Sequence, residues 1–328
     1  MKKLSAIIAC YKDAQAIPVM HERLSRTFAE IGVEYEIIFV NDGSPDNTEE
    51  VLAEITGVDK RTVAVHHTRN FGSQNAFASG MKIATGDAVV LLDGDLQDPP
   101  ELIKEFHKKW EEGYDIVYGV RVKREGTAFL RVAYRAFYRV FKAVSYLEIP
   151  LDAGDFSLIG RKAVDAINAL PERNRFLRGI RAWVGFKQIG VPYNRPERMF
   201  GKSTNSLLKN IGWAGRGIIS FSYIPLNLIV FLAAATMGMA LLGMGGQIAA
   251  RLIWPGSVAW GITTVISVIL FVGAVQLLCL SVIGSYLAQI YEEVKRRPIS
   301  IIGRIDNKPN GIGGIGDTRE NKDGPERP

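Results

Sequence analysis

The sequence predicts an α/β protein whose doubly wound, mostly parallel sheet is followed by two transmembrane helices. In the first part of the chain, short apolar runs alternate with helical patterns, which is typical of a parallel sheet covered by helices. Nearer the end, residues 217–250 and 252–291 contain no charged side chain. Each of these stretches exceeds the roughly 20 apolar residues that are needed to cross a bilayer.

Five short runs rich in Val, Ile, Leu and Phe are predicted to form buried strands. They are residues 4–9, 36–41, 63–66, 88–92 and 115–119. Between the first two runs, apolar residues recur at helical spacing from Ile17 to Ile31, and the same spacing follows the second run at residues 51–55. Strand and helix therefore alternate, as expected for a doubly wound fold.

The chain is predicted to divide into four parts. They are a domain of residues 1–200, a juxtamembrane amphipathic segment of residues 201–222, two transmembrane helices within residues 223–291, and a disordered tail of residues 303–328. We place the two spans near residues 225–248 and 258–281. The tail is polar and rich in Gly, a composition that buries too little apolar surface to fold.

Basic residues flank the predicted spans unequally. Lys202, Lys209 and Arg216 precede the first span and residues 295–297 (Lys-Arg-Arg) follow the second, whereas the loop between the spans offers only Arg251. Because cytoplasmic flanks carry the excess of Lys and Arg, we expect an inner (plasma) membrane protein with its domain and both termini in the cytoplasm. The net charge of +6 suits an anionic lipid surface, and no recognition motif indicates a nucleic-acid partner.

Two carboxylates follow the predicted strand at residues 88–92. Asp93 and Asp95 stand one residue apart at its carboxyl end, the edge where open α/β sheets bind ligands. Neighbouring carboxylates repel unless a cation lies between them, and Mg²⁺ or Mn²⁺ commonly bridges such oxygens to phosphates. We therefore predict a metal site for a nucleotide diphosphate, with a solvated acidic turn as the alternative. Asp98 is expected to cap the helix that follows, because Asp is favoured at that position.

An acid also ends the second predicted strand. Asp42 lies in residues 40–44 (Val-Asn-Asp-Gly-Ser), where a carboxylate can accept hydrogen bonds from the base or ribose of a nucleotide. An ordinary Asp-Gly turn explains the same residues equally well. No glycine-rich dinucleotide fingerprint follows the first strand, which disfavours a nicotinamide cofactor.

A basic stripe is predicted on a helix after the fifth strand. Arg131, Arg135, Arg139 and Lys142 recur at spacings of four, four and three residues, so they share one helix face. With its aromatic neighbours, the stripe is typical of an interfacial helix on lipid head groups, and Arg also matches phosphate geometry. A solvated charged face is the plain alternative, but the predicted membrane spans favour the lipid interpretation.

Several short motifs are spread along the chain. They are residues 40–44 (Val-Asn-Asp-Gly-Ser), 69–72 (Arg-Asn-Phe-Gly), 93–100 (Asp-Gly-Asp-Leu-Gln-Asp-Pro-Pro), 154–156 (Gly-Asp-Phe), 170–173 (Leu-Pro-Glu-Arg), 183–185 (Trp-Val-Gly) and 291–295 (Tyr-Glu-Glu-Val-Lys). Together they resemble the family 2 glycosyltransferases with the Rossmann-like GT-A fold. The likeness covers nearly the whole chain and is greatest for the polyprenyl-phosphate branch, which contains bactoprenol glucosyltransferases and dolichol-phosphate mannose synthases.

The resemblance implies that the donor is a UDP-sugar. The residues implied to bind it are Tyr11, Asp13, Asp42, Asp93 and Arg121. Asp93 and Asp95 together would hold Mg²⁺ or Mn²⁺ against the diphosphate. The metal and Arg121 would then neutralise the charge that develops on the leaving group.

The implied acceptor is a polyprenyl phosphate, such as undecaprenyl phosphate, at the bilayer surface. The residues implied to bind its phosphate are Arg131, Arg135, Arg198, Lys202 and Ser203. Asp155 is the implied catalytic residue, and it either acts as a base or orients the acceptor. Direct displacement by a phosphate oxygen would invert the anomeric centre. Association of copies through the transmembrane helices is compatible with the sequence.

Three places depart from the family pattern. Residues 9–13 read Ala-Cys-Tyr-Lys-Asp where the family has Pro-x-Tyr-Asn-Glu, residues 73–74 are Ser-Gln where relatives often carry Lys-Glu, and Thr204 stands where Lys is expected. Glucose is the sugar we favour, with N-acetylglucosamine, an aminoarabinose derivative and mannose as alternatives.

Two other classes of function compete with this interpretation. A processive polysaccharide synthase usually carries a Gln-x-x-Arg-Trp motif, which residues 178–183 (Arg-Gly-Ile-Arg-Ala-Trp) lack. A non-enzymatic membrane scaffold conflicts with the joint presence of Asp42, Asp93, Asp95 and Asp155. We therefore expect an enzyme that glycosylates a lipid phosphate.

Overall fold

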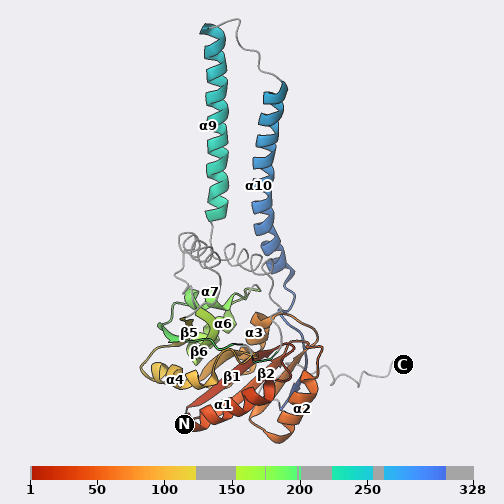
Figure 1. Ribbon diagram of the computed structural model, residues 1–328, viewed down its shortest axis with the longest axis vertical. Helices are drawn as coiled ribbons and strands as arrows, with labels where there is room; N and C mark the ends of the chain where they lie inside the picture. Colours follow the sequence, from red (N-terminus) through yellow and green to blue (C-terminus); the bar gives the residue numbers. More distant parts are fainter. Residues whose placement is uncertain are drawn as a thin grey trace, which may run out of the picture. The chain divides into compact units, whose positions relative to one another are not determined.

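The computed structural model of the chain describes residues 2–122, 153–173, 175–197, 199–200, 224–253 and 262–307. These residues belong to two compact units (Figure 1). The first unit contains a sheet with its helices and includes residues 297–307, although these follow the long helices in the sequence. The second unit contains the two long helices.

The sheet of the first unit has the strand order β7-β5-β6-β4-β1-β2-β3-β8 within the described residues. Its strands are β1 (Lys3–Cys10), β2 (Glu34–Asn41), β3 (Thr62–His67), β4 (Ala88–Asp93), β5 (Ile116–Arg121), β6 (Ala153–Gly160), β7 (Gln188–Tyr193) and β8 (Ile302–Asp306). β6 and β8 run antiparallel to their neighbours, and the other adjacent pairs are parallel. The five predicted strands correspond to β1–β5, which confirms the predicted, mostly parallel α/β sheet.

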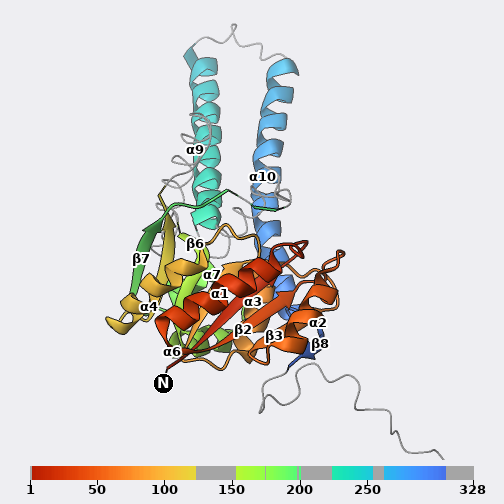
Figure 2. The same ribbon diagram turned by 60° about the horizontal axis from the view of Figure 1, so that its bottom comes forward.

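Helices cover both faces of the sheet (Figures 1 and 2). They are α1 (Ile17–Ile31), α2 (Thr48–Val58), α3 (Ser73–Ile83), the short 3₁₀ helix η1 (Pro100–Leu102), α4 (Ile103–Glu111), α6 (Arg161–Ala169) and α7 (Leu177–Trp183). α1 contacts α2, η1 and α4, whereas α3 contacts α6. This division into two helical layers is what a doubly wound sheet requires.

α1 and α3 pack on opposite faces of β1. The apolar face predicted between Ile17 and Ile31 is buried and clusters with Ile8. On the other face, α3 approaches so closely that a Cβ at Gly80 would lie 2.4 Å from Cγ2 of Ile7. Because successive strand residues point to opposite faces, a strand buried on both sides is expected to be apolar nearly throughout, as residues 6–10 of β1 are.

The predicted disordered tail begins with a strand, and this part of the prediction is wrong. β8 pairs antiparallel with β3 at the edge of the sheet. Arg304 and Asp306 give the segment a polar composition, but charged side chains are common on edge strands because they discourage further pairing. Residues 308–328 of the predicted tail lie outside the described residues.

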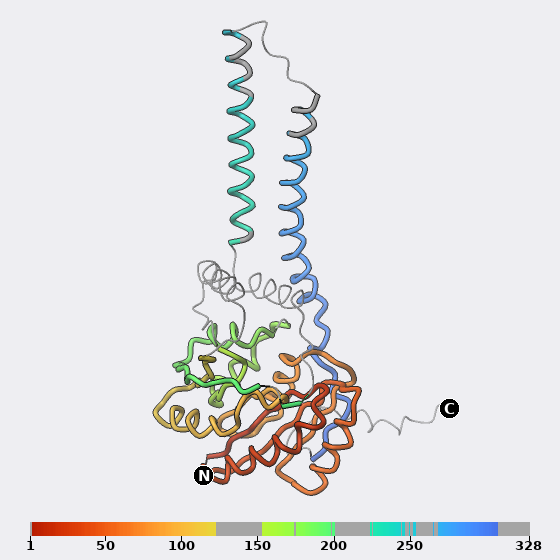
Figure 3. Tube along the Cα trace, viewed as in Figure 1, coloured from red at the N-terminus to blue at the C-terminus, as the bar shows by residue number. Residues whose placement is uncertain are grey.

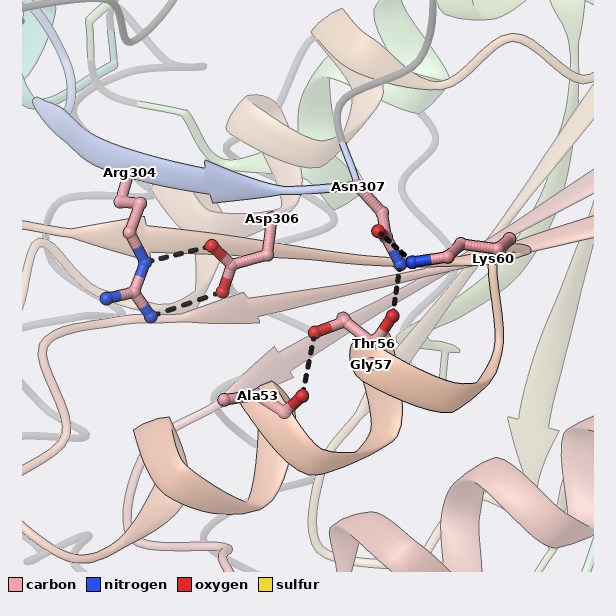
Figure 4. A pocket seen from close by; sticks show the side chains of 7 residues that line it. All are labelled: Ala53, Thr56, Gly57, Lys60, Arg304, Asp306 and Asn307. Atoms are coloured by element: carbon pink, nitrogen blue, oxygen red, sulfur yellow. Dashed lines mark hydrogen bonds and ion pairs between the residues drawn. The ribbon is translucent and has the colours of Figure 1, made fainter.

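Side chains at the end of β8 contact α2 and the start of β3. Asn307 Nδ2 donates hydrogen bonds to the carbonyl oxygens of Thr56, at 2.6 Å, and Thr62, at 3.0 Å. Arg304 forms an ion pair with Glu49 at 2.7 Å. Figure 4 shows the open pocket at this junction, which is lined by Ala53, Thr56, Gly57, Lys60, Arg304, Asp306 and Asn307. The last strand is therefore tied to the domain by backbone and side-chain contacts.

The second unit contains α9 (Ile224–Ile253) and α10 (Ile262–Lys295), drawn as a trace in Figure 3. At about 1.5 Å per residue, each helix is longer than a bilayer core of about 30 Å. Both are apolar enough to cross a membrane, and large side chains such as Leu242 and Leu270 are exposed on them. They are the two predicted transmembrane helices, with α10 continuing past the predicted end at residue 281. The predicted juxtamembrane segment, residues 201–222, lies outside the described residues.

Candidate active site

The predicted acidic pair lies at the carboxyl end of β4. Asp93 is the last residue of β4 and pairs in register with Ala9 of β1. Gly94 then turns the chain, its N–H donating to the carbonyl oxygen of Ala9 at 3.0 Å. A Cβ at Gly94 would lie 3.0 Å both from that oxygen and from Asp13 Oδ2. The close approach therefore favours glycine and leaves Asp95 at the sheet edge, where its Oδ1 accepts from the Gln97 N–H at 3.1 Å.

Asp155 reaches the same edge because β6 runs antiparallel to β4. Leu91 and Ser157 form the last pair of that ladder, and continuing its register by two residues sets Asp155 across from Asp93. Asp155 is the third residue of β6 and is 9% exposed. The sheet thus brings together two acids that are far apart in the sequence.

Asp93 lies where negative charge is poorly tolerated. Burial, together with the nearby carboxylates of Asp98, Asp155 and Asp95, raises the pKa of Asp93 to about 8. Among the described residues, Arg195 lowers the pKa of Asp93 and so offsets this repulsion only in part. A cation would offset it directly.

The donor set fits a hard divalent cation. Asp93 and Asp95 offer carboxylate oxygens one residue apart, the ligand type that Mg²⁺ and Mn²⁺ prefer. Among the described side chains, no group of three or more His, Cys, Asp or Glu could enclose a metal by itself. This matches Mg²⁺ sites in which one or two carboxylates are completed by water and substrate phosphates.

Asp98 does not cap the following helix, contrary to the prediction. Pro99 occupies the N-cap position of η1, and no side chain caps it. Asp98 is instead buried, and its Oδ1 accepts a hydrogen bond from Tyr193 Oη at 2.6 Å. Tyr193 Oη also accepts from Arg121 Nε at 3.3 Å. Asp98 therefore bonds to the buried Tyr193 instead of capping the helix. Through Tyr193, Arg121 is held beside the acidic pair.

Asp155 has the opposite environment from Asp93. Arg178 approaches both of its oxygens, with Nε at 3.1 Å from Oδ1 and Nη2 at 3.3 Å from Oδ2. Gln74 Nε2 donates to Oδ2 at 2.9 Å. Burial acts to raise the pKa of Asp155, but Arg178, Arg181 and Gln74 outweigh it and hold the pKa below its usual range. Asp155 is therefore an ionised carboxylate with an arginine partner.

Asp42 is more enclosed than the sequence predicts. It is 2% exposed, and it accepts hydrogen bonds from His67 Nδ1 at 2.8 Å and from the N–H groups of Phe71, at 2.8 Å, and Gly72, at 2.7 Å. A carboxylate offers about four lone-pair positions, so little capacity is left for a nucleoside. The observed contacts make Asp42 the anchor of the loop at residues 69–72.

The loop after β1 brings Tyr11 and Asp13 to the same edge. The Tyr11 N–H donates to Asp13 Oδ2 at 3.0 Å, and that carboxylate lies next to Gly94. Both predicted donor residues thus border the turn that carries the acidic pair. The predicted acceptor residues lie outside the described residues: Arg131, Arg135, Arg198, Lys202 and Ser203.

Gln74, Arg178, Tyr193 and Arg195 are absent from the predicted site residues. Gln74 and Arg178 contact Asp155, and Arg195 Nη2 lies 3.8 Å from Asp95 Oδ2. Gln74 follows the motif at residues 69–72 and Arg178 begins the stretch at residues 178–183, but neither pattern assigned them a role. Tyr193 ends β7, and Gln74 lies in the first turn of α3. Only their positions near the ends of helices and strands at this sheet edge could have indicated that they belong to the site.

Comparison with known proteins identifies the family of this chain. Residues 5–167 match the family model described as Glycosyl transferase family 2. The chain is 39% identical over 308 residues to "Uncharacterized glycosyltransferase YkcC" of Bacillus subtilis, covering 93% of this chain and 95% of that protein. The chain belongs to glycosyl transferase family 2. It is an enzyme of glycosyl transfer, and its sheet is the GT-A fold that the motifs implied.

Two further similarities concern this glycosyltransferase. It is 37% identical over 302 residues to "Bactoprenol glucosyl transferase" of Shigella phage SfII, covering 92% of this chain and 97% of that protein. Among solved structures, glucosyl-3-phosphoglycerate synthase from Mycobacterium tuberculosis, in complex with Mn²⁺, UDP-glucose and phosphoglyceric acid, is similar with a TM-score of 0.42 and 18% identity, covering 66% of this chain and 77% of that one. Because both sequence relatives cover more than nine-tenths of the chain, their likeness includes the long helices.

Proposed function

We propose that this glycosyltransferase transfers glucose from UDP-glucose to a polyprenyl phosphate at the cytoplasmic face of the plasma membrane. The observation that carries the proposal is the match of nearly the whole chain to a bactoprenol glucosyl transferase. Bactoprenol is a polyprenol, so its phosphate is a lipid that two membrane helices would keep within reach. The charge arrangement at the sheet edge supports the same chemistry.

The donor would bind over the carboxyl ends of β1 and β4. Asp93 and Asp95 would hold Mg²⁺ or Mn²⁺, which supplies positive charge for the diphosphate when it is bound. Tyr11 and Asp13 border this turn and would contact the nucleoside. Asp42 would act by fixing the loop at residues 69–72 as a wall of that pocket.

Arg121 would stabilise the departing diphosphate. Its guanidinium is held beside the acidic pair by Tyr193, and Gly154 leaves room for it, since a Cβ there would lie 3.0 Å from Nη2. A fixed arginine at a point where negative charge develops lowers the barrier without reorganisation. This assigns Arg121 to the leaving group.

The acceptor phosphate would supply the nucleophile. An ionised oxygen of the polyprenyl phosphate attacks the anomeric carbon while the bond from that carbon to the UDP oxygen breaks, which gives glucosyl polyprenyl phosphate and UDP. Because a phosphate monoester has its second pKa at about 6, this oxygen needs no base at neutral pH. Asp155, already ionised and paired with Arg178, would therefore orient the acceptor through Arg178, because a guanidinium can donate to the phosphate. Displacement would invert the anomeric centre.

The lipid side of the proposal rests on the sequence. The basic stripe, with Arg198, Lys202 and Ser203, would collect the lipid phosphate, because Arg and Lys are the usual partners of phosphate groups. The excess of basic residues at the outer flanks of the two spans supports a cytoplasmic site. Transfer of N-acetylglucosamine, an aminoarabinose derivative or mannose to the same lipid is the alternative.

A transfer assay with the full-length protein tests the proposal. Purified enzyme in lipid vesicles is given undecaprenyl phosphate, Mn²⁺ or Mg²⁺, and a panel of radiolabelled nucleotide sugars. We expect label to enter the lipid fraction from UDP-glucose and to fall to background when EDTA is added. Transfer from a different sugar nucleotide would support the alternative, and the absence of lipid-linked label from every donor would contradict the proposed acceptor.

A further inference from the structure

Arg195 faces the acidic edge of the sheet from the loop that follows β7. It lies two residues after Tyr193, the last residue of β7. Its Nη2 is 3.8 Å from Asp95 Oδ2, and its Nε is 4.0 Å from Asp98 Oδ1. Asp98 Oδ1 also accepts the hydrogen bond from Tyr193 Oη. One guanidinium is therefore shared by two of the acids that crowd Asp93.

The backbone beside Arg195 is fixed, whereas its side chain is loosely held. Gln97 Nε2 donates to the Pro196 carbonyl oxygen at 3.3 Å, which ties the loop to the turn that carries Asp95. A residue that precedes proline is also confined to extended backbone. In contrast, both contacts of the guanidinium exceed hydrogen-bond length. Its buried Nε donates no hydrogen bond within the described part of the chain.

These contacts make the acids a poor permanent partner for Arg195. Arginine and carboxylate normally form short, forked hydrogen bonds, and a buried N–H without an acceptor is destabilising. Among the described residues, Arg195 forms no such fork, although its charge lies near both Asp95 and Asp98. Its unused donors suit the ionised oxygens of a diphosphate, the group that the proposed function places over this edge.

We propose that Arg195 is a temporary counter-ion of the acidic edge, which exchanges the acids for the diphosphate of the donor. In the donor-free enzyme it offsets part of the negative charge of Asp95 and Asp98. When the donor arrives with its divalent cation, the guanidinium leaves the acids to that cation and donates to the diphosphate instead. This inference rests on the donor site of the proposed function. The competing explanation is a structural role, in which Arg195 only lessens repulsion among the acids.

Removing the charge of Arg195 should change two affinities in opposite directions. In Arg195→Gln the cation no longer meets a positive neighbour, so Mn²⁺ should bind the donor-free protein about three- to tenfold more tightly. Both charges of the cation gain from the lost repulsion, which outweighs the added cost of removing one proton from the acids. The diphosphate loses a charged donor, so UDP should bind about tenfold more weakly at saturating Mn²⁺. A structural role predicts unchanged UDP affinity.

The experiment compares the wild type with Arg195→Gln, Arg195→Lys and Arg26→Gln. The full-length proteins are held in vesicles of phosphatidylcholine, whose head groups carry no net charge and compete little for Mn²⁺. Free Mn²⁺ is followed by electron paramagnetic resonance without donor, UDP affinity by calorimetry at saturating Mn²⁺, and folding by thermal unfolding.

Two of these variants serve as controls for charge. Arg195→Lys keeps the charge but loses the fork, so it should bind Mn²⁺ like the wild type and UDP about threefold more weakly. Arg26→Gln removes an exposed charge that pairs with Glu22 on α1. It should match the wild type in all three measurements.

Every other outcome overturns the proposal. Unchanged or weaker Mn²⁺ binding by a folded Arg195→Gln protein would show that Arg195 does not hold the place of the cation. Tighter Mn²⁺ binding with unchanged UDP affinity would leave only the structural role. If Arg195→Gln does not fold, wild-type UDP affinity of Arg195→Lys rejects the contact with the diphosphate. A wild type that binds neither Mn²⁺ nor UDP contradicts the proposed function itself, so the two failures are distinguishable.

Discussion

Asp93 and Asp155 lie across from each other on adjacent strands, yet their surroundings prepare them for opposite states. Asp93 is crowded by other acids, and its pKa is raised to about 8. Asp155 is paired with Arg178 and accepts a hydrogen bond from Gln74, and its pKa is lowered. The difference teaches that one sheet edge can hold two carboxylates in different states. Asp93 needs a cation to carry its charge, whereas Asp155 carries its charge without one. The placement of arginines, rather than the acids themselves, makes this distinction.

The largest effect should come from the cation side of this comparison. Asp95→Asn keeps the shape of the side chain but removes a charge that would hold the metal, so transfer should fall about 100- to 1,000-fold. Radiolabelled transfer to undecaprenyl phosphate measures it. Asp87→Asn, at the exposed residue just before β4, is the matched control and should behave as the wild type. Near-normal turnover of Asp95→Asn, or full activity in excess EDTA, would remove the metal from this edge.

Asp155→Asn tests the other side of the comparison. If Asp155 acts on the acceptor, its variant should bind UDP-glucose within about twofold of the wild type, yet transfer glucose about a hundredfold more slowly. Calorimetry of donor binding beside single-turnover kinetics makes the distinction. Unimpaired transfer would leave Asp155 without a role in the reaction, and weakened donor binding would make both acids donor ligands.

The raised pKa of Asp93 predicts a pH dependence for cation binding. Below pH 8 a proton must leave before the cation binds, so the affinity for Mn²⁺ with UDP should rise about tenfold per pH unit and level off near that pH. The cation-free protein should respond in the opposite sense. A carboxyl whose folded-state pKa is raised makes the folded state less stable as pH rises from about 4 to 8. Calorimetry and thermal unfolding over this range check both slopes, and pH-independent affinity would show that Asp93 is already charged.

Arg178→Met would make the two acids more alike. Arg178 holds the pKa of Asp155 low, so in the wild type this group keeps its charge, and the stability it contributes, until the pH falls well into the acid range. Without Arg178 the pKa of Asp155 rises, so the rate of transfer by the variant should begin to fall at a higher pH than that of the wild type. Parallel pH profiles of the two enzymes would show that Arg178 does not set the charge of Asp155.

The smallest effect should come from the basic stripe. Arg131→Gln should raise the concentration of polyprenyl phosphate needed for half-maximal rate by about fivefold, since one surface charge contributes about 1 kcal/mol toward an anionic lipid surface. UDP-glucose affinity should not change. If titration shows weaker nucleotide binding instead, the stripe belongs to the donor side.

Much of the fold and the acidic pair could be predicted because they depend on local patterns. The apolar runs gave β1–β5, and the carboxyl ends of parallel strands necessarily meet at one edge. Gln74 and Arg178 could not be predicted, because their contact with Asp155 depends on an antiparallel strand that brings three distant segments together. Asp98 was wrongly predicted as a cap for the same reason, since its buried partner, Tyr193, is distant in the sequence.

The position of β8 has a consequence for how the chain is made. A ribosome synthesises β3 early and β8 only after both long helices, so the outer edge of β3 has no strand partner while those helices emerge and insert. Ser300, just before β8, also supplies a hydroxyl 2.7 Å from Ser79 Oγ, which contacts His67 and through it Asp42. The anchor of the loop at residues 69–72 is thus completed last. A nascent chain acquires the complete set of contacts behind this loop only after its membrane segments have been translated.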